Sequence, residues 1–310
     1  MYSENPLKDG ALFVRAALTN QMARFPLYLQ LAGGSGRGSG PEPSQKAAAY
    51  FRRCLGDLVG QLDLSGAEAS SILEGKRILE YGPGDALGVA LLLYAHGAAS
   101  IECVDRFPRH THSEKAVGIY QAILDGLDPV RRARAARAFK QAGNPASGFR
   151  EGAIEYRVTP DGLSGRRSIY DLIVSRSVLG LVNRLDRTIE DIAVGLRPGG
   201  LSVHKVDLSS HGLDRYRPLD FLSWPEALYR LMYSRKGRPN RWRVDKYREL
   251  VERAGLTCRK LEPTGQIGAG EVARLLPSLP APFRSVPPEL LSWLGFWMVL
   301  EATPAPSGSV

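Results

Sequence analysis

The apolar and polar positions along the chain follow two alternating patterns. Short runs rich in apolar residues have the length and composition of buried strands, and the longer segments between them repeat their apolar residues at helical spacing. Strands that alternate with helices in this way are typical of an α/β fold with a largely parallel sheet. The expected strands cover residues 76–79, 100–105, 154–158, 170–175, 201–208, 256–261 and 294–303, and the expected helices cover 86–93, 113–127, 187–196 and 244–254.

The N-terminal part of the chain lies outside this alternation. Residues 1–31 and 43–64 have helical apolar spacing, and the residues between them are rich in glycine and serine, which is typical of flexible chain. We therefore expect residues 1–70 to form a helical extension that covers the rest of the protein, with a flexible segment at 32–43. The main domain is expected to cover 71–310.

A turn with two glycines follows the first expected strand, at residues 80–85, which read EYGPGD. Gly82 and Gly84 let the backbone turn sharply and let a ligand approach it closely, and the helix that follows offers free N–H groups. The second expected strand ends in Asp105, at about the distance where a nucleotide-binding βαβ unit places its ribose ligand. This arrangement predicts a cofactor that contains a nucleoside.

The residues around the turn favour one such cofactor over another. A dinucleotide site has a third glycine where this chain has Leu87, and Glu80 and Asp85 would repel a pyrophosphate. The same carboxylates suit the amino group and the sulfonium of S-adenosylmethionine (SAM). The chain thereby resembles the class I SAM-dependent methyltransferase family, whose first motif is an acidic residue followed by Gly-x-Gly and whose second strand ends in an acidic residue. The matching residues are Glu80, Gly82, Gly84 and Asp105.

This resemblance implies a fold and a set of cofactor contacts. The fold is a Rossmann-like, doubly wound sheet of seven strands in the order 3-2-1-4-5-7-6, with strand 7 antiparallel. Beyond the turn, the implied SAM contacts follow the second, third and fourth strands, at Arg106, Phe107, Asp161, Ser175 and Arg176. Phe107 is placed to stack on adenine, with a plain core position as the open alternative. Asp161 is placed to accept from the adenine amino group, and Ser175 and Arg176 stand at the methionine end of the pocket.

The family pattern is interrupted after the fourth strand. Many relatives continue with Val-Leu-Glu-His-Val, whereas this chain has Gly180 and Leu181 at the two polar positions. A hydroxyl acceptor then needs another base. His211 paired with Asp207 is our candidate, because both lie at or beyond the carboxyl end of the fifth strand. We expect His204, within that strand, to be buried and bonded to the backbone.

The segment 214–243 is too long for a simple crossover, and it interleaves aromatic with cationic side chains. We expect it to form an insertion over the active site. A guanidinium matches a carboxylate or phosphate, so Arg241, Trp242 and Arg243 are predicted to bind a compact, aromatic or sugar-like acceptor with an anionic group. A solvent-exposed basic loop is the open alternative.

Composition and charge indicate which kind of molecule the protein binds as its acceptor. The 310 residues carry a formal net charge of +9, and the cationic segment 131–140 is compatible with RNA binding, although such a run is more commonly a solvated helix surface. The chain lacks the Asn/Asp-Pro-Pro-Tyr motif of many enzymes that methylate bases. We therefore expect a small-molecule acceptor and keep nucleic acid as an open but disfavoured partner. The alternatives are an RNA methyltransferase, a SAM-binding protein without catalytic activity and a nucleotide-dependent oxidoreductase.

The number of cysteines and the hydropathy of the chain indicate its cellular compartment. Cys54, Cys103 and Cys258 are widely spaced and odd in number, which predicts no disulfide framework, and His110 with His112 is an incomplete metal ligand set. We expect no metal. No apolar run approaches membrane-spanning length, and the first residues do not have the pattern of a signal peptide. These features predict a cytoplasmic enzyme without a membrane partner, and they leave its oligomeric state open.

Overall fold

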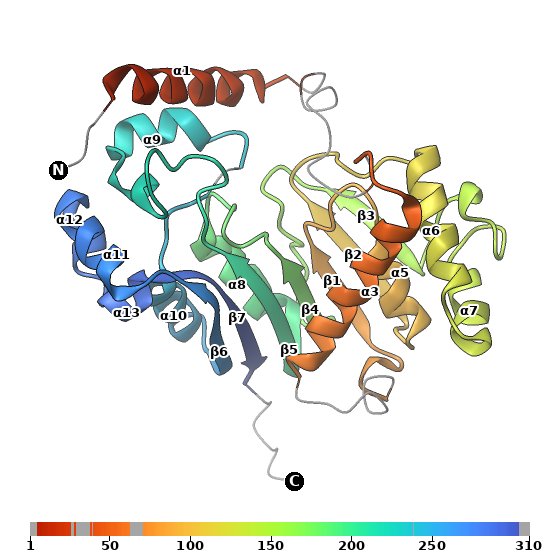
Figure 1. The fold of residues 1–310 in the computed structure, drawn as a ribbon. Helices are drawn as coiled ribbons and strands as arrows, with labels where there is room; N and C mark the ends of the chain where they lie inside the picture. The colour runs from red at the N-terminus through yellow and green to blue at the C-terminus, as the bar shows by residue number, and fades with distance from the viewer. Residues whose placement is uncertain are drawn as a thin grey trace, which may run out of the picture.

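A seven-stranded sheet forms the centre of the molecule (Figure 1). The computed structural model describes residues 5–25, 28, 38, 40–62, 71–237 and 239–303. In chain order the strands are β1 Arg77–Tyr81, β2 Ser100–Asp105, β3 Ile154–Val158, β4 Tyr170–Arg176, β5 Leu196–Asp207, β6 Leu256–Gln266 and β7 Trp293–Ala302. Their spatial order is β3-β2-β1-β4-β5-β7-β6, and β7 runs antiparallel to both of its neighbours. The predicted Rossmann-like order is confirmed.

The central strand β1 shows why the sheet is doubly wound. Ile78 pairs in parallel register with Ile101 of β2 and with Leu172 of β4. Ile78 and its neighbour Leu79 are both buried, and they belong to separate apolar clusters on the two faces of the sheet. A parallel strand that is apolar on both faces needs helices on both sides.

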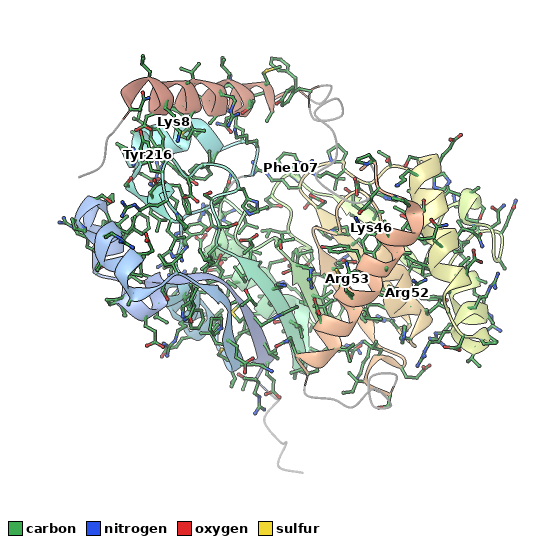
Figure 2. All side chains as sticks on the ribbon, viewed as in Figure 1. Lys8, Lys46, Arg52, Arg53, Phe107 and Tyr216 are labelled. Atoms are coloured by element: carbon green, nitrogen blue, oxygen red, sulfur yellow. The ribbon has the colours of Figure 1, made fainter. Side chains whose placement is uncertain are left out.

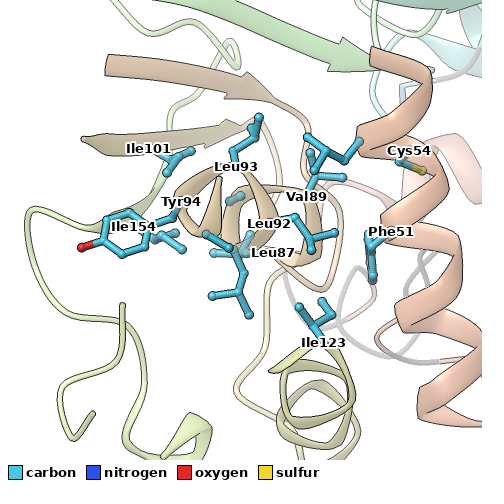
Figure 3. Packing of buried hydrophobic residues seen from close by; sticks show 14 of the residues in the cluster. Phe51, Cys54, Leu87, Val89, Leu92, Leu93, Tyr94, Ile101, Ile123 and Ile154 are labelled. Atoms are coloured by element: carbon cyan, nitrogen blue, oxygen red, sulfur yellow. The ribbon is translucent and has the colours of Figure 1, made fainter. Parts of the chain in front are cut away.

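Helices cover both faces of the sheet. One face carries α3 Ser44–Gly60, α5 Gly88–Ala95, α6 Glu114–Asp125 and α7 Pro129–Ala136, and the other carries α8 Leu185–Gly195 and α10 Val244–Arg253. Figure 3 shows Phe51 of α3 against α5 in the first cluster. A Cβ at Gly88 would lie 2.3 Å from the Phe51 ring, so glycine at this position lets α3 and α5 approach each other closely.

A third apolar cluster forms a cap beside the sheet. We use "the cap" for α1 Pro6–Met22, the segment 208–243 with η2 Asp220–Ser223 and α9 Glu226–Tyr233, and the short helices α11 Ala269–Leu275, η3 Leu276–Ser278, α12 Ala281–Arg284 and α13 Pro288–Leu291. A further short helix, η1 Pro145–Ser147, lies outside it. In Figure 1 the red helix α1 lies across α9 at the outer edge of the molecule. No helix within these described ranges has the length and apolar character to cross a bilayer.

Asn20 joins α1 to the rest of the cap. Its side chain is fully buried, and its Nδ2 donates to the carbonyl oxygen of Leu231 at 2.8 Å. Its Oδ1 accepts from the backbone N–H groups of Arg235 (2.8 Å) and Lys236 (3.1 Å). A buried amide with these three partners fixes the N-terminal helix on the turn that follows α9. Most of the predicted flexible segment 32–43 lies outside the described residues.

Candidate functional site

A cavity of 840 Å³ opens at the carboxyl ends of β1, β2 and β4. Its volume falls in the range of roughly 300–1,000 Å³ that is typical of small-molecule sites, and it lies at the edge where open parallel sheets bind ligands. Figure 2 shows Phe107 in this region, between α1 and the sheet. The lining residues that the sequence predicted are Glu80, Gly82, Gly84, Asp85, Asp105, Arg106, Phe107, Asp161, Arg176 and His211.

The two glycines of the turn have the geometry that a close ligand approach requires. Gly82 and Gly84 have φ angles of +58° and +82°, in the left-handed region that favours glycine. A Cβ at Gly82 would lie 2.5 Å from Cγ2 of Val178, whereas a Cβ at Gly84 would meet nothing within 4 Å. Gly82 is therefore required for packing, and Gly84 leaves its backbone open to the cavity.

Glu80 places a carboxyl group under the turn. It is 8% exposed, and burial raises its pKa to about 7. The Sγ of Cys103 donates to its Oε2 at 3.8 Å, which favours the ionised form only weakly. A carboxyl group of this kind changes its charge near neutral pH, and a cationic ligand in the cavity would stabilise the ionised form.

Asp105 ends β2 beside the turn. Its Oδ1 accepts from the backbone N–H of Phe107 at 3.1 Å, and burial raises its pKa against the opposing effect of that bond and of Arg109. The guanidinium carbons of Arg106 and Arg109 lie 5.2 and 5.6 Å from the centre of the Phe107 ring. Phe107 is half-buried and lines the cavity, and Asp161 lies exposed at the cavity edge.

Asp85 is directed toward the N-terminal part of the chain. It is 3% exposed, and its Oδ1 accepts from the backbone N–H of Gly38 at 2.7 Å. His110 lies 3.3 Å from the carbonyl oxygen of Asp85 through its Nδ1, and His112 lies 2.8 Å from the carbonyl oxygen of Ala146 through its Nε2. In the described ranges, no group of three His, Cys, Asp or Glu side chains is arranged to hold a metal ion.

Two predicted cofactor residues lie side by side at the end of β4, but only one of them faces the cavity. Arg176 lines the cavity and forms an ion pair with Asp57 of α3 at 2.8 Å. Ser175 is fully buried instead, and its Oγ lies 2.8 Å from Nδ1 of His204. This corrects two expectations, because Ser175 does not line the cavity and His204 pairs with a side chain rather than with the backbone. Alternation along the strand turns neighbouring side chains to opposite faces.

His211 and Asp207 lie beyond the carboxyl end of β5. His211 lines the cavity, and its Nε2 lies 3.5 Å from Oδ2 of Asp207. Asp207 does not line the cavity, and its Oδ1 accepts from the backbone N–H of Ser209 at 2.8 Å. A Cβ at Gly180 would lie 2.0 Å from the carbonyl oxygen of Asp207, so the position where many relatives have glutamate has no room for a side chain here.

Arg241 lies outside the cavity, contrary to the sequence-based expectation. It is buried in the cap, donates to the carbonyl oxygens of Leu222 (3.3 Å) and Trp224 (2.5 Å), and pairs with Glu226. These bonds occupy the guanidinium that was predicted to bind the acceptor.

Arg243 and Trp242 are also structural. Arg243 is 2% exposed, donates to the carbonyl oxygens of Leu208 (3.3 Å), Leu291 (3.2 Å) and Trp293, and burial lowers its pKa to about 10. Trp242 packs against the apolar cluster under β5 and β7. The sequence pattern did not distinguish a guanidinium that bonds backbone carbonyls from one that faces a ligand.

A further part of the cavity wall consists of residues that the sequence did not single out as site residues, although Lys236 and Gly237 lie in the predicted insertion 214–243. They come from the end of α1, the start of α8 and the loop after α9: Thr19, Ala23, Tyr28, Asn183, Arg184, Arg187, Thr188, Lys236 and Gly237. None of them belongs to a motif, and their assembly depends on contacts between segments that are far apart in sequence. The pairing of Lys236 with α1 is an example, because its Nζ donates to the carbonyl oxygen of Ala16 at 2.8 Å.

A comparison with protein families assigns the chain to one of them. A family model described as "Methyltransferase domain" matches residues 57–261. No curated protein matches the chain.

Three solved structures show the range of similar folds. A SAM-dependent methyltransferase from Mesorhizobium loti has 18% identity and a TM-score of 0.40, with 76% of this chain and 98% of that chain covered. Magnesium protoporphyrin IX methyltransferase from Synechocystis has 13% identity and a TM-score of 0.44, with 81% and 82% covered. The [4+2]-cyclase SpnF has 16% identity and a TM-score of 0.43, with 93% and 97% covered.

The solved structures at these identities do not inform the acceptor. The family match, in contrast, covers more than half of the chain and includes the glycine turn, Asp105 and the end of β4. The chain therefore belongs to the methyltransferase domain family, and it is a class I methyltransferase that uses SAM as its cofactor.

Proposed function

We propose that this methyltransferase acts on a small molecule that carries an anionic group. The observation that supports the proposal is the distribution of charge in the cavity. The carboxylates that line it, Glu80, Asp85, Asp105 and Asp161, all come from the turn and from the ends of β2 and β3, where Arg106, Arg109 and, at the end of β4, Arg176 also line the cavity. The lining residues from the cap and from the start of α8 include Arg184, Arg187 and Lys236 and, among the described residues, no carboxylate.

The acidic end of the cavity suits SAM. We assign the ribose hydroxyls to Asp105, the cationic part of the cofactor to Glu80, the adenine to Phe107 and Asp161, and the methionine end to Arg176, all of which line the cavity. When bound, SAM supplies an electrophilic methyl group on a cationic sulfur. The chain's own task is to hold the acceptor nucleophile in line with that group and to exclude water.

The cationic wall suits the acceptor. Arg187 is exposed at the start of α8, and no ion pair with it occurs in the described part of the chain. Arg184 beside it is paired with Asp186 at 2.7 Å. Of the two, Arg187 has the guanidinium that an incoming carboxylate or phosphate can bind without breaking an ion pair.

His211 is the proposed general base for a hydroxyl acceptor. It faces the cavity, and Asp207, held by the backbone of Ser209, orients its ring. A base in contact with the acceptor matters for a hydroxyl, whereas a carboxylate or phenolate acceptor needs none.

The cationic segment that motivated the RNA alternative forms bonds within the protein. Arg134 of α7 donates to the carbonyl oxygens of Tyr94 (2.9 Å) and Gly97 (2.6 Å) at the end of α5. Arg131 pairs with Asp128, and Arg132 with Asp125. These contacts give the run a structural role on α7 that does not require RNA.

Initial-rate measurements with tritiated SAM test the proposal. The panel consists of hydroxylated aromatic acids and sugar acids, each beside its neutral amide. We expect methylation of acids in preference to amides, and we expect Arg187→Ala to raise KM for the acid by about tenfold, the loss of one charge-assisted contact. The matched control is Arg53→Ala, because Arg53 lies on α3 outside the cavity (Figure 2) and its removal should leave KM unchanged.

Two results would overturn the proposal. One is an amide that serves as well as its acid, with KM for the acid unaffected by Arg187→Ala. The other is methylation of RNA with an affinity that falls steeply as salt increases, which would favour the RNA alternative.

A further inference from the structure

The outer face of α1 exposes large apolar side chains in one row. Its members are Leu7 (85% exposed), Val14 (52%), Leu18 (59%), Met22 (46%) and, just past the helix, Phe25 (64%). Intervals of seven, four, four and three residues keep them on one side of a helix. We call this row the outer face.

The outer face points away from the molecule. The opposite side of α1 holds Ala16 and Asn20, which are 5% and 0% exposed, and it packs on the cap. In Figure 1, α1 lies at the edge of the molecule, and Figure 2 shows side chains on its outward side. Leu228 and Leu231 of α9, 37% and 47% exposed, extend the apolar surface next to it. Seven of the ten large exposed apolar side chains in the described part of the chain therefore lie on these two helices and at Phe25.

The charges beside the outer face are positive. Arg15 and Arg24 are exposed. The one acidic residue of α1, Asp9, pairs with Arg215 at 3.1 Å and accepts from the hydroxyl of Tyr216 at 3.0 Å.

The acidic residue of α9 is paired as well. Its one acidic residue, Glu226, pairs with Arg230 and Arg241. The surface thus presents apolar side chains with arginines at their edges, and both carboxylates on the two helices are occupied.

We propose that the outer face docks peripherally on an anionic lipid bilayer. A convex apolar row with flanking cations suits the boundary between headgroups and acyl chains, where the apolar side chains are buried and the arginines contact anionic lipids. The surface is a ridge, and a bilayer, unlike a folded protein partner, needs no complementary groove to receive it. The sequence-based expectation of no membrane partner concerned spanning segments, and this mode of binding requires none. It goes beyond the proposed acceptor chemistry and does not depend on it.

Docking in this way has a consequence for the cavity. Thr19 of α1 and Ala23, the residue directly after it, line the cavity, so the helix that would lie on the bilayer also borders the site. The bound enzyme would hold its cavity close to the lipid surface.

Sedimentation of the full chain with vesicles tests the proposal. Vesicles of phosphatidylcholine with phosphatidylglycerol should sediment the protein at low salt, and vesicles of phosphatidylcholine alone should not. The double variant Val14→Glu with Leu18→Glu should reduce the bound fraction by more than about tenfold, because it places carboxylates at the lipid boundary. The matched control is Val130→Glu, since Val130 is 79% exposed on α7, away from the outer face, and binding should persist.

Three results would overturn it. The first is a wild type that does not bind the anionic vesicles. The second is a double variant that binds them as well as the wild type while its circular dichroism is unchanged. The third is a dimer in light scattering that the double variant converts to a monomer, which would assign the outer face to a second copy of the chain. SAM binding should be equal in all variants, so a failure here is distinct from a failure of the acceptor proposal.

Discussion

The carboxyl groups of Glu80 and Asp105 show how burial sets the chemistry of the cofactor end. Both lie beside the glycine turn, and burial raises the pKa of each. Asp105 has a backbone N–H donor from Phe107 and the charge of Arg109 nearby, whereas Glu80 has the thiol of Cys103 and the backbone of Ala90 as donors and no cation among the causes of its pKa shift. Glu80 is therefore the residue whose charge depends on whether a cation is bound near it.

Replacement of Glu80 by glutamine should affect stability only at higher pH. A folded-state pKa of about 7, against an ordinary value of 4.5, means that the folded protein binds the proton more tightly than the unfolded chain. The wild type therefore loses stability as the pH rises from about 4.5 to about 7, by on the order of 3 kcal/mol. In urea unfolding of the free protein, Glu80→Gln should be more stable than the wild type at pH 8 and equal to it at pH 4.

The same substitution should weaken SAM binding. Calorimetry should show that wild-type affinity rises as the pH increases through about 7, because the ionised carboxylate attracts the cationic ligand. The affinity of Glu80→Gln should be lower and independent of pH in this range. If the difference in unfolding free energy between Glu80→Gln and the wild type is the same at pH 4 and pH 8, the raised pKa assigned to Glu80 is wrong.

Replacement of His211 by alanine should lower kcat by about 100-fold or more for a hydroxyl acceptor and leave SAM affinity unchanged, because the imidazole accepts the proton of the nucleophile. Asp207→Asn should have a smaller effect, since Asp207 only orients the ring at 3.5 Å. His112→Ala is the control, because His112 is exposed and lies outside the main cavity. A kcat equal to that of the wild type would remove His211 from catalysis.

Among the elements, the contact between the segment after β4 and the end of β5 shapes the acceptor side of the cavity. The carbonyl oxygen of Gly180 accepts from the backbone N–H of Asn240 at 2.9 Å. The Cα of Gly180 faces the carbonyl of Asp207. The two chain segments approach so closely that glycine is the one residue that fits between them. A polar side chain at position 180 would not fit this approach.

Gly180→Ala should therefore disturb the end of β5 and the residues that follow it. We expect a loss of about 1–3 kcal/mol of stability from overpacking, together with a lower kcat and an unchanged Kd for SAM. Gly56→Ala is the matched control, because a Cβ at Gly56 of α3 meets nothing within 4 Å and helix propensity predicts a neutral or stabilising effect. Equal melting temperatures and rates for Gly180→Ala and the wild type would show that the contact is not tight.

At the scale of the whole molecule, the sheet and the cap differ in how far sequence predicts them. The strands and the glycine turn followed from local patterns, because each is continuous in sequence, whereas the order of the strands followed from the resemblance to the methyltransferase family. The acceptor wall did not, because its residues come from α1, α8 and the loop after α9, which meet only in the folded chain. Arg241 and Arg243 illustrate the limit, since the same guanidinium chemistry that binds anions also binds buried carbonyl oxygens.

The separation of the apolar clusters has an evolutionary consequence. The buried members of the cap cluster, from Ala16 to Leu291, are distinct from those of the two clusters that flank the sheet. Substitutions among the buried members of the cap cluster should therefore have little direct effect on the packing of the two clusters beside the sheet. Such modularity lets a lineage explore new substrates while it retains an inherited donor, and it offers protein engineers a unit to exchange: a cap grafted from one homologue onto the sheet of another.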